Sequence, residues 1–139
     1  MFENILLAVD GSDDSLRAAA VAGNLARSEK TATVRVLTVY DSVPGYLGDP
    51  NQKAIIAAHM EEAERILQAA LGQLGAVPGE VDTEVLCGSA AEEIVEAAQD
   101  RHADLIVMGS RGKGRLLGIL GSHSHKVASH APCPVLLVR

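Results

Sequence analysis

Short apolar runs alternate with longer amphipathic stretches along the chain. Short runs rich in Val, Ile and Leu that end in turn residues predict buried strands, and apolar positions three and four residues apart predict helices. The expected strands cover 4–9, 33–40, 80–88, 103–109 and 133–139, and the expected helices cover 13–30, 52–74, 89–101 and 124–130. Strands that alternate with helices predict an α/β fold, in which helices cover both faces of a parallel sheet.

Polar residues mark the starts of two of these helices. Ser12 is placed to cap the helix over 13–30, and Asp13 and Asp14 suit the positive end of its dipole. Ser89 is the expected cap of the helix over 89–101, because Ser89 to Glu92 has the S-x-x-E form of a capping box.

Length and composition fit one domain over residues 1–139, with 47% hydrophobic and 22% charged residues. No apolar run approaches the ~20 residues that cross a bilayer, and the start lacks the features of a signal peptide. Cys87 and Cys133 show no metal-ligand spacing and are expected to be buried thiols without a disulfide. We therefore expect a cytoplasmic protein that makes no contact with a membrane.

Charge is distributed unevenly. The net charge is −6, yet residues 105–139 contain no acid, five Lys or Arg and three of the five histidines. A solvated basic face or chance clustering is one interpretation, and an anion site is the other. Nucleic acid is disfavoured as a partner, since the overall charge is negative and only Phe2, Tyr40 and Tyr46 are aromatic.

The order of elements predicts where a ligand binds. Doubly wound sheets bind ligands beyond the carboxyl ends of their strands, where the strand order reverses. If the order is 3-2-1-4-5, the strands over 4–9 and 103–109 flank that crevice. The residues that leave them are Asp10-Gly11-Ser12 and Gly109-Ser110-Arg111-Gly112.

The stretch GSRGKGRLLGILGS, residues 109–122, has five glycines, three basic residues and no acid. Glycines let backbone N–H groups approach oxyanions, the helix that follows offers a positive dipole end, and Arg111 and Lys113 add mobile charge. Asp10 would repel phosphate but would accept hydrogen bonds from a base or ribose. Together these features suggest a nucleotide, although the P-loop and dinucleotide motifs fail at Arg115-Leu116 and Leu117.

Each of these residues also has a simpler interpretation. Asp-Gly is a common turn pair, so Asp10 is also compatible with a role as a turn cap. Arg111 and Lys113 are as compatible with charges in solvent as with contacts to phosphate. His123 and His125 form an H-x-H, but their side chains would diverge on a helix, so no metal site is expected.

Three segments, ILLAVDGSDDS, GSAAEEIVEAAQDRHADLIVMGSRG and GSHSHKVASHAPCPVLLVR, closely resemble the universal stress protein (UspA) family over the whole chain. The resemblance implies a Rossmann-like, doubly wound five-stranded parallel sheet of order 3-2-1-4-5. It also implies binding of ATP, with AMP or ADP as alternatives and with or without Mg²⁺, in a protein of the stress response. The family's loop has nine residues between G-x-x-G and G-S/T, whereas Gly112 and Gly121 enclose eight here.

The resemblance assigns roles by position. Asp10 resembles the family's adenine-contacting aspartate, and Val39 resembles the hydrophobic wall of its adenine pocket. Ser124 matches a second position at which the family has a hydroxyl side chain, and His123 stands where an apolar residue is commoner. The residues that resemble the family's phosphate loop are Gly109, Gly112, Gly121 and Ser122. With Arg111 and the strand-end residues, the candidate nucleotide-binding residues are Ala8, Val9, Asp10, Val39, Met108, Gly109, Arg111, Gly112, Gly121, Ser122, His123 and Ser124.

The sequence also suggests a partner and two alternative functions. The apolar last strand is expected to pair with a second copy through Val135–Val138, as the resemblance also implies, and so to form a homodimer. Slow ATP hydrolysis or self-phosphorylation at Ser122 or Ser124 is an alternative function, although no general base or complete catalytic set is evident. A nucleotide-free dimeric interaction module, with a loop too short for its ligand, is the other alternative.

Overall fold

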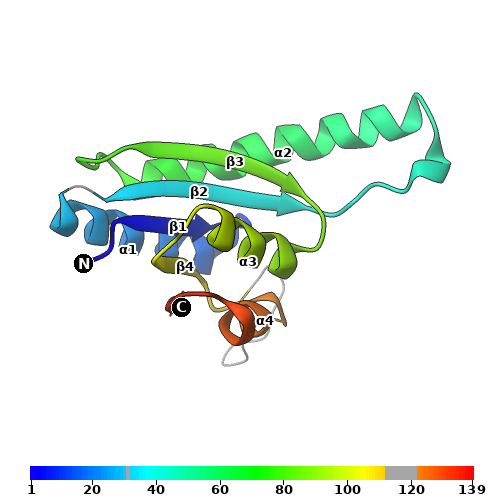
Figure 1. The fold of residues 1–139 in the computed structure, drawn as a ribbon. Helices are drawn as coiled ribbons and strands as arrows, with labels where there is room; N and C mark the ends of the chain where they lie inside the picture. Colours follow the sequence, from blue (N-terminus) through cyan, green and yellow to red (C-terminus); the bar gives the residue numbers. More distant parts are fainter. Residues whose placement is uncertain (31, 112–121) are drawn as a thin grey trace.

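A computed structural model describes residues 1–30, 32–111 and 122–139 of the chain, and Figure 1 shows its elements. The strands are β1 (Asn4–Ala8), β2 (Thr33–Tyr40), β3 (Val81–Cys87), β4 (Leu105–Gly109) and β5 (Val135–Val138). The helices are α1 (Asp13–Glu29), α2 (Asn51–Leu74), α3 (Ala90–Asp100) and α4 (Ser122–His130), with a short 3₁₀ helix, η1 (Gly45–Leu47), between β2 and α2.

The five strands form one parallel sheet of order β3-β2-β1-β4-β5. This confirms the predicted α/β fold and strand order. In register, Ala8 of β1 lies between Leu37 of β2 and Met108 of β4. The carboxyl ends of these three strands therefore meet at the point where the strand order reverses.

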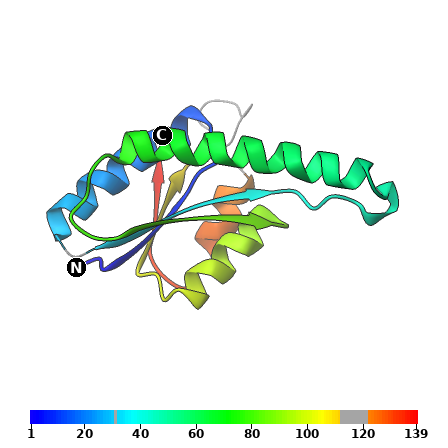
Figure 2. The same ribbon diagram turned by 90° about the horizontal axis from the view of Figure 1, so that it is seen from above.

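Helices cover both faces of the sheet, as Figure 2 shows from above: α1 and α2 lie on one face, and α3 and α4 on the other. Successive side chains of β1 point to opposite faces of the sheet. Ile5 and Leu7 belong to the apolar core under α1 and α2, whereas Leu6 and Ala8 belong to the core under α3 and α4. Such nearly continuous burial is typical of a parallel sheet covered on both sides, and it explains the uninterrupted apolar run in the sequence.

Helix α1 begins and packs for identifiable reasons. The Ser12 hydroxyl accepts a 3.2 Å hydrogen bond from the Ser15 backbone N–H, which confirms the predicted cap. Farther along, Gly23 faces the end of α2, where an added Cβ would lie 2.2 Å from the carbonyl oxygen of Leu74. Glycine is required there because α1 and α2 approach so closely.

Two smaller expectations were wrong. Ser89 occupies the cap position of α3, but its side chain makes no capping hydrogen bond, so the S-x-x-E pattern forms no capping box. Cys87 is exposed, because it ends β3 at the edge of the sheet, while Cys133 is half-buried; both thiols are free. In the described part of the chain, no helix has both the length and the apolar character to cross a bilayer.

Candidate functional site

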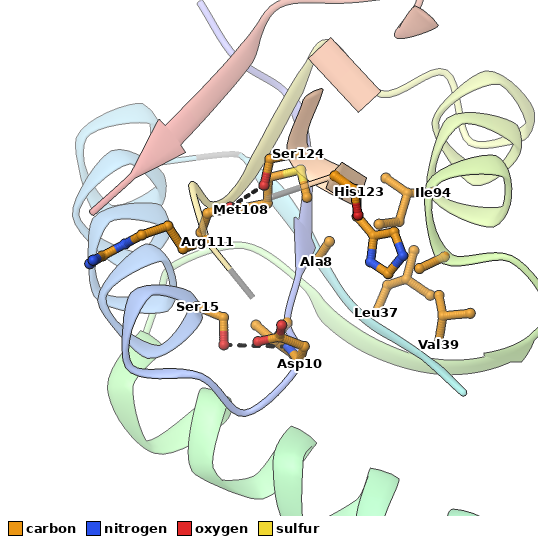
Figure 3. A pocket seen from close by; sticks show the side chains of 14 residues that line it. Ala8, Asp10, Ser15, Leu37, Val39, Ile94, Met108, Arg111, His123 and Ser124 are labelled. Atoms are coloured by element: carbon orange, nitrogen blue, oxygen red, sulfur yellow. Dashed lines mark hydrogen bonds between the residues drawn. The ribbon is translucent and has the colours of Figure 1, made fainter. Parts of the chain in front are cut away.

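A pocket of about 170 Å³ opens at the carboxyl ends of β1 and β4, on the side of the sheet covered by α3 and α4. The structure brings ten of the twelve candidate residues together around it, as Figure 3 shows for most of them. These ten are Ala8, Val9, Asp10, Val39, Met108, Gly109, Arg111, Ser122, His123 and Ser124. Gly112 and Gly121, with the shortened spacing between them, lie outside the described residues. Contact with a ligand stays a prediction for all twelve.

Apolar side chains form one wall of the pocket. Leu37 and Val39 are two residues apart on β2, so both point to the face under α3, where Ile94 meets them. Ala8 and Met108 continue this wall across β1 and β4. A wall of this kind suits the flat, apolar faces of a planar ring.

Asp10 lies at the rim of the pocket, in the turn between β1 and α1. One carboxylate oxygen, Oδ1, accepts a 2.9 Å hydrogen bond from the Ser12 backbone N–H, and Gly11 has a φ of 84°, in the left-handed region that glycine favours. The Asp10 backbone N–H donates to the Ser15 hydroxyl at 3.3 Å. Asp10 therefore does cap a turn. Its side chain is exposed, and none of the hydrogen bonds between described residues uses its Oδ2.

Gly109 ends β4 against the first turn of α1. A Cβ at this position would lie 2.9 Å from both the Asp14 Cβ and the Ser15 backbone nitrogen. Glycine is therefore needed for the packing of β4 on α1, whatever its role toward a ligand. The buried Ser124 hydroxyl donates a 2.8 Å hydrogen bond to the Gly109 carbonyl, which attaches the first turn of α4 to the same point.

Arg111 is held in an ion pair and is neither a solvated nor a mobile charge. Its Nε donates to Oδ2 of Asp14 at 2.9 Å, and its Nη2 donates to Oδ1 at 2.8 Å. Asp14 is only 4% exposed. Hydrogen bonds from Arg111 lower the pKa of Asp14 below its usual range, although burial acts in the opposite direction. The guanidinium points away from the apolar wall in Figure 3.

Helix α4 begins at Ser122, two residues before the predicted start, and its first turn forms the side of the pocket opposite Asp10. Ser122 and His123 both line the cavity, and the imidazole of His123 lies beside Leu37, Val39 and Ile94 in Figure 3. His123 thus occupies a place next to the apolar wall. In the described residues, no group of three or more His, Cys, Asp or Glu side chains is arranged to hold a metal ion.

Sequence reasoning missed four lining residues: Ser15, Leu37, Ala90 and Ile94. Leu37 could have been found, since it shares a strand face with Val39. Ala90 and Ile94 lie at the start of α3, and only the packing of α3 over the ends of β1 and β2 brings them to the pocket. No sequence pattern indicated Ser15, because the hydrogen bond from the Asp10 backbone N–H to its hydroxyl follows no motif.

Comparisons with known proteins agree over the full length. A model of the universal stress protein family matches residues 1–139. The "universal stress protein in QAH/OAS sulfhydrylase 3′ region" of Thermus aquaticus is 48% identical over 140 residues, covering 100% of both chains. The universal stress protein UspA from Lactobacillus plantarum has a TM-score of 0.85 at 29% identity, covering 99% of this chain and 97% of that one. A universal stress protein solved in complex with cAMP has a TM-score of 0.73 at 25% identity, with coverages of 99% and 97%.

Proposed function

The chain belongs to the universal stress protein family, and on that premise we propose that its pocket binds an adenine nucleotide. The observation that carries the proposal is the apolar wall ending at the Asp10 carboxylate on one side and at the first turn of α4 on the other. These three surfaces offer, in order, a place for a purine ring, an acceptor for its polar edge or ribose, and a place for phosphate. The related protein solved with cAMP supports this choice of ligand class.

The base is proposed to lie against Leu37, Val39 and Ile94. Burying the faces of a purine there removes apolar surface from water, and the exposed Asp10 Oδ2 remains available to accept from an amine or a hydroxyl. Adenine carries a 6-amino group where hypoxanthine carries a carbonyl. A carboxylate acceptor therefore favours adenine.

The phosphates are proposed to meet the first turn of α4. The N-terminus of a helix presents N–H groups without intrahelical partners and a positive dipole end. Among the described residues that line the pocket, Asp10 is the only carboxylate, so Mg²⁺ would be held by phosphate oxygens and water. ATP stays the expected ligand, in a nucleotide-dependent role in the stress response of the cytoplasm.

Calorimetric titration of AMP, ATP and IMP into the purified protein tests the proposal. We expect AMP and ATP to bind, and IMP to bind more weakly because it lacks the amine. Asp10→Asn is expected to weaken AMP binding by roughly tenfold, the difference between a charged and a neutral acceptor. Asp13→Asn is the matched control, since Asp13 is an exposed carboxylate three residues away that does not line the pocket. Absence of binding by every nucleotide would favour the nucleotide-free interaction module.

A phosphotransfer activity is the second candidate, because the Ser122 hydroxyl belongs to the pocket lining. Ser124 is a poorer acceptor, since it is buried and donates to the Gly109 carbonyl. Radiolabel from γ-labelled ATP that stays on the wild type but not on Ser122→Ala would support self-phosphorylation. Equal labelling of both proteins, or none, would contradict it.

Strand β5 is proposed to be the interface of a homodimer. It is an edge strand of the sheet, and Leu136 in its middle is 38% exposed. An apolar edge carries unpaired backbone donors and acceptors that a second copy can satisfy. The dimer would double the nucleotide sites without altering either pocket.

A further inference from the structure

A buried carboxylate lies behind the pocket, in the first turn of α1. Asp14 is 4% exposed, and its two oxygens accept hydrogen bonds from three side chains. Arg111 occupies both oxygens, the Ser110 hydroxyl donates to Oδ2 at 3.2 Å, and Arg17 donates to Oδ1. A buried charge is tolerated only when it is paired and hydrogen-bonded, as it is here.

Two of these three donors leave β4 directly. Ser110 and Arg111 follow the last residue of the strand, Gly109, whose missing Cβ permits the close approach of β4 to Asp14. Ser110 is itself buried at 3% exposure, and its backbone N–H donates to the Val138 carbonyl of β5. The backbone at this point is thus held from α1 and from β5.

The same point supports α4. Ser124 is anchored to the carbonyl of Gly109, one residue before Ser110. The position of the first turn of α4 therefore depends on where the chain leaves β4. Asp14 accepts hydrogen bonds from the two residues that follow Gly109, Ser110 and Arg111, although it does not line the pocket itself.

We propose that Asp14 is a positioning residue for the phosphate side of the nucleotide site, acting through its paired Arg111. The inference rests on the proposed function. Arg111 fits a supporting role because Nε and Nη2 are both used on Asp14 and the guanidinium points away from the apolar wall (Figure 3). Removing Asp14 or Arg111 shifts the residues at the end of β4, and with them the first turn of α4. The shift lowers the affinity for ligands that carry phosphate. Adenosine, which has only the base and ribose, is unaffected.

A competing arrangement makes the opposite prediction. If Arg111 were a phosphate ligand that Asp14 restrains, loss of the Asp14 charge would free the guanidinium, and AMP would bind more tightly. The sign of the change in AMP affinity on Asp14→Asn therefore separates positioning from competition.

The experiment is calorimetric titration of AMP and adenosine into the wild type, Asp14→Asn, Arg111→Lys and Arg17→Ala. Arg111→Lys keeps the charge but loses the two parallel hydrogen bonds, so an unchanged AMP affinity in this variant would overturn the inference even if Asp14→Asn fails to fold. Arg17→Ala is the matched control, since Arg17 contacts the same carboxylate from within α1 and is 51% exposed. Thermal unfolding of each variant verifies that it is folded.

We expect AMP affinity to fall roughly tenfold in Asp14→Asn and in Arg111→Lys, the scale of coupling between contacting residues, with adenosine affinity unchanged. Arg17→Ala is expected to match the wild type for both ligands. Tighter AMP binding, or equal losses for AMP and adenosine, would overturn the inference while leaving the proposed function intact. A wild type that binds neither ligand would overturn both.

Discussion

The Ser124 hydroxyl donates a 2.8 Å hydrogen bond to the carbonyl oxygen of Gly109, so the start of α4 is attached to the end of β4. These residues are 15 positions apart, and both line the pocket. The bond is buried, with Ser124 3% exposed. One side of the candidate site thus depends on a polar contact between two elements that the chain separates.

Replacing Ser124 tests the importance of this contact. Ser124→Ala is expected to lower the free energy of unfolding by about 1–2 kcal/mol, because the Gly109 carbonyl loses a buried donor. Urea unfolding measures the loss. Ser129→Ala is a control on the same helix, since the exposed Ser129 hydroxyl donates at 2.9 Å to the His125 carbonyl within α4. It is expected to change stability by less than about 0.5 kcal/mol, and an equal loss in both variants would contradict the assignment.

Gly109 is expected to tolerate no side chain. In Gly109→Ala the new Cβ would lie 2.9 Å from backbone and Cβ atoms of α1, so β4 and α1 must separate. We expect a loss of roughly 1–3 kcal/mol in the free energy of unfolding. In Gly72→Ala, on the exposed side of α2, the Cβ meets nothing within 4 Å. That control is expected to gain up to about 1 kcal/mol, because alanine favours the helix. A neutral Gly109→Ala would show that the close approach is not required.

The Asp14–Arg111 pair predicts a dependence of stability on pH. Arg111 lowers the pKa of Asp14 in the folded chain, whereas in the unfolded chain the pKa returns to about 3.9. The unfolded state therefore binds the proton more readily, and the pair's contribution is complete at pH values above about 5. It is lost as the pH falls below about 4 toward the lowered folded pKa.

Urea unfolding of the wild type and Asp14→Asn between pH 7 and pH 3 measures this contribution. We expect the difference in stability between the two proteins to be largest near neutral pH and to shrink as the pH approaches 3. A difference that stays constant over this range would show that Asp14 has an ordinary pKa in the folded chain.

The proposed homodimer can be tested at the two edges of the sheet. Leu136→Glu places a charge in the middle of β5 and is expected to convert a dimer into a monomer, as measured by sedimentation at micromolar concentration. Val81→Glu is the matched control on β3, the opposite edge strand, where Val81 is 37% exposed. It is expected to leave the dimer intact. A wild type that sediments as a monomer would exclude this interface.

Individual residues show how much of the structure could be predicted from the sequence. The alternation of strands and helices and the Ser12 cap could be predicted, because apolar periodicity and local capping act over a few residues. The strand order came from the resemblance to the universal stress protein family. Asp14 was recognised only as a charge in the first turn of α1. Its bonds to Ser110 and Arg111 cross 96 and 97 positions, which no local pattern encodes. The capping box at Ser89 failed for the opposite reason, since a local motif can match while its hydroxyl makes no such bond.

By itself, the sequence determined the alternation of strands and helices, the carboxyl-end location of the pocket, and ten residues that line it. The alternation follows from periodicity, and the location of the pocket follows from the rule that ligands bind beyond the carboxyl ends of parallel strands. The ten residues follow from that rule together with the resemblance to the universal stress protein family. Only the tertiary structure decided which way the polar side chains point. Arg111 is paired with Asp14 and Ser124 with Gly109, because close packing of β4 against α1 and α4 leaves each of these two donors an acceptor within reach.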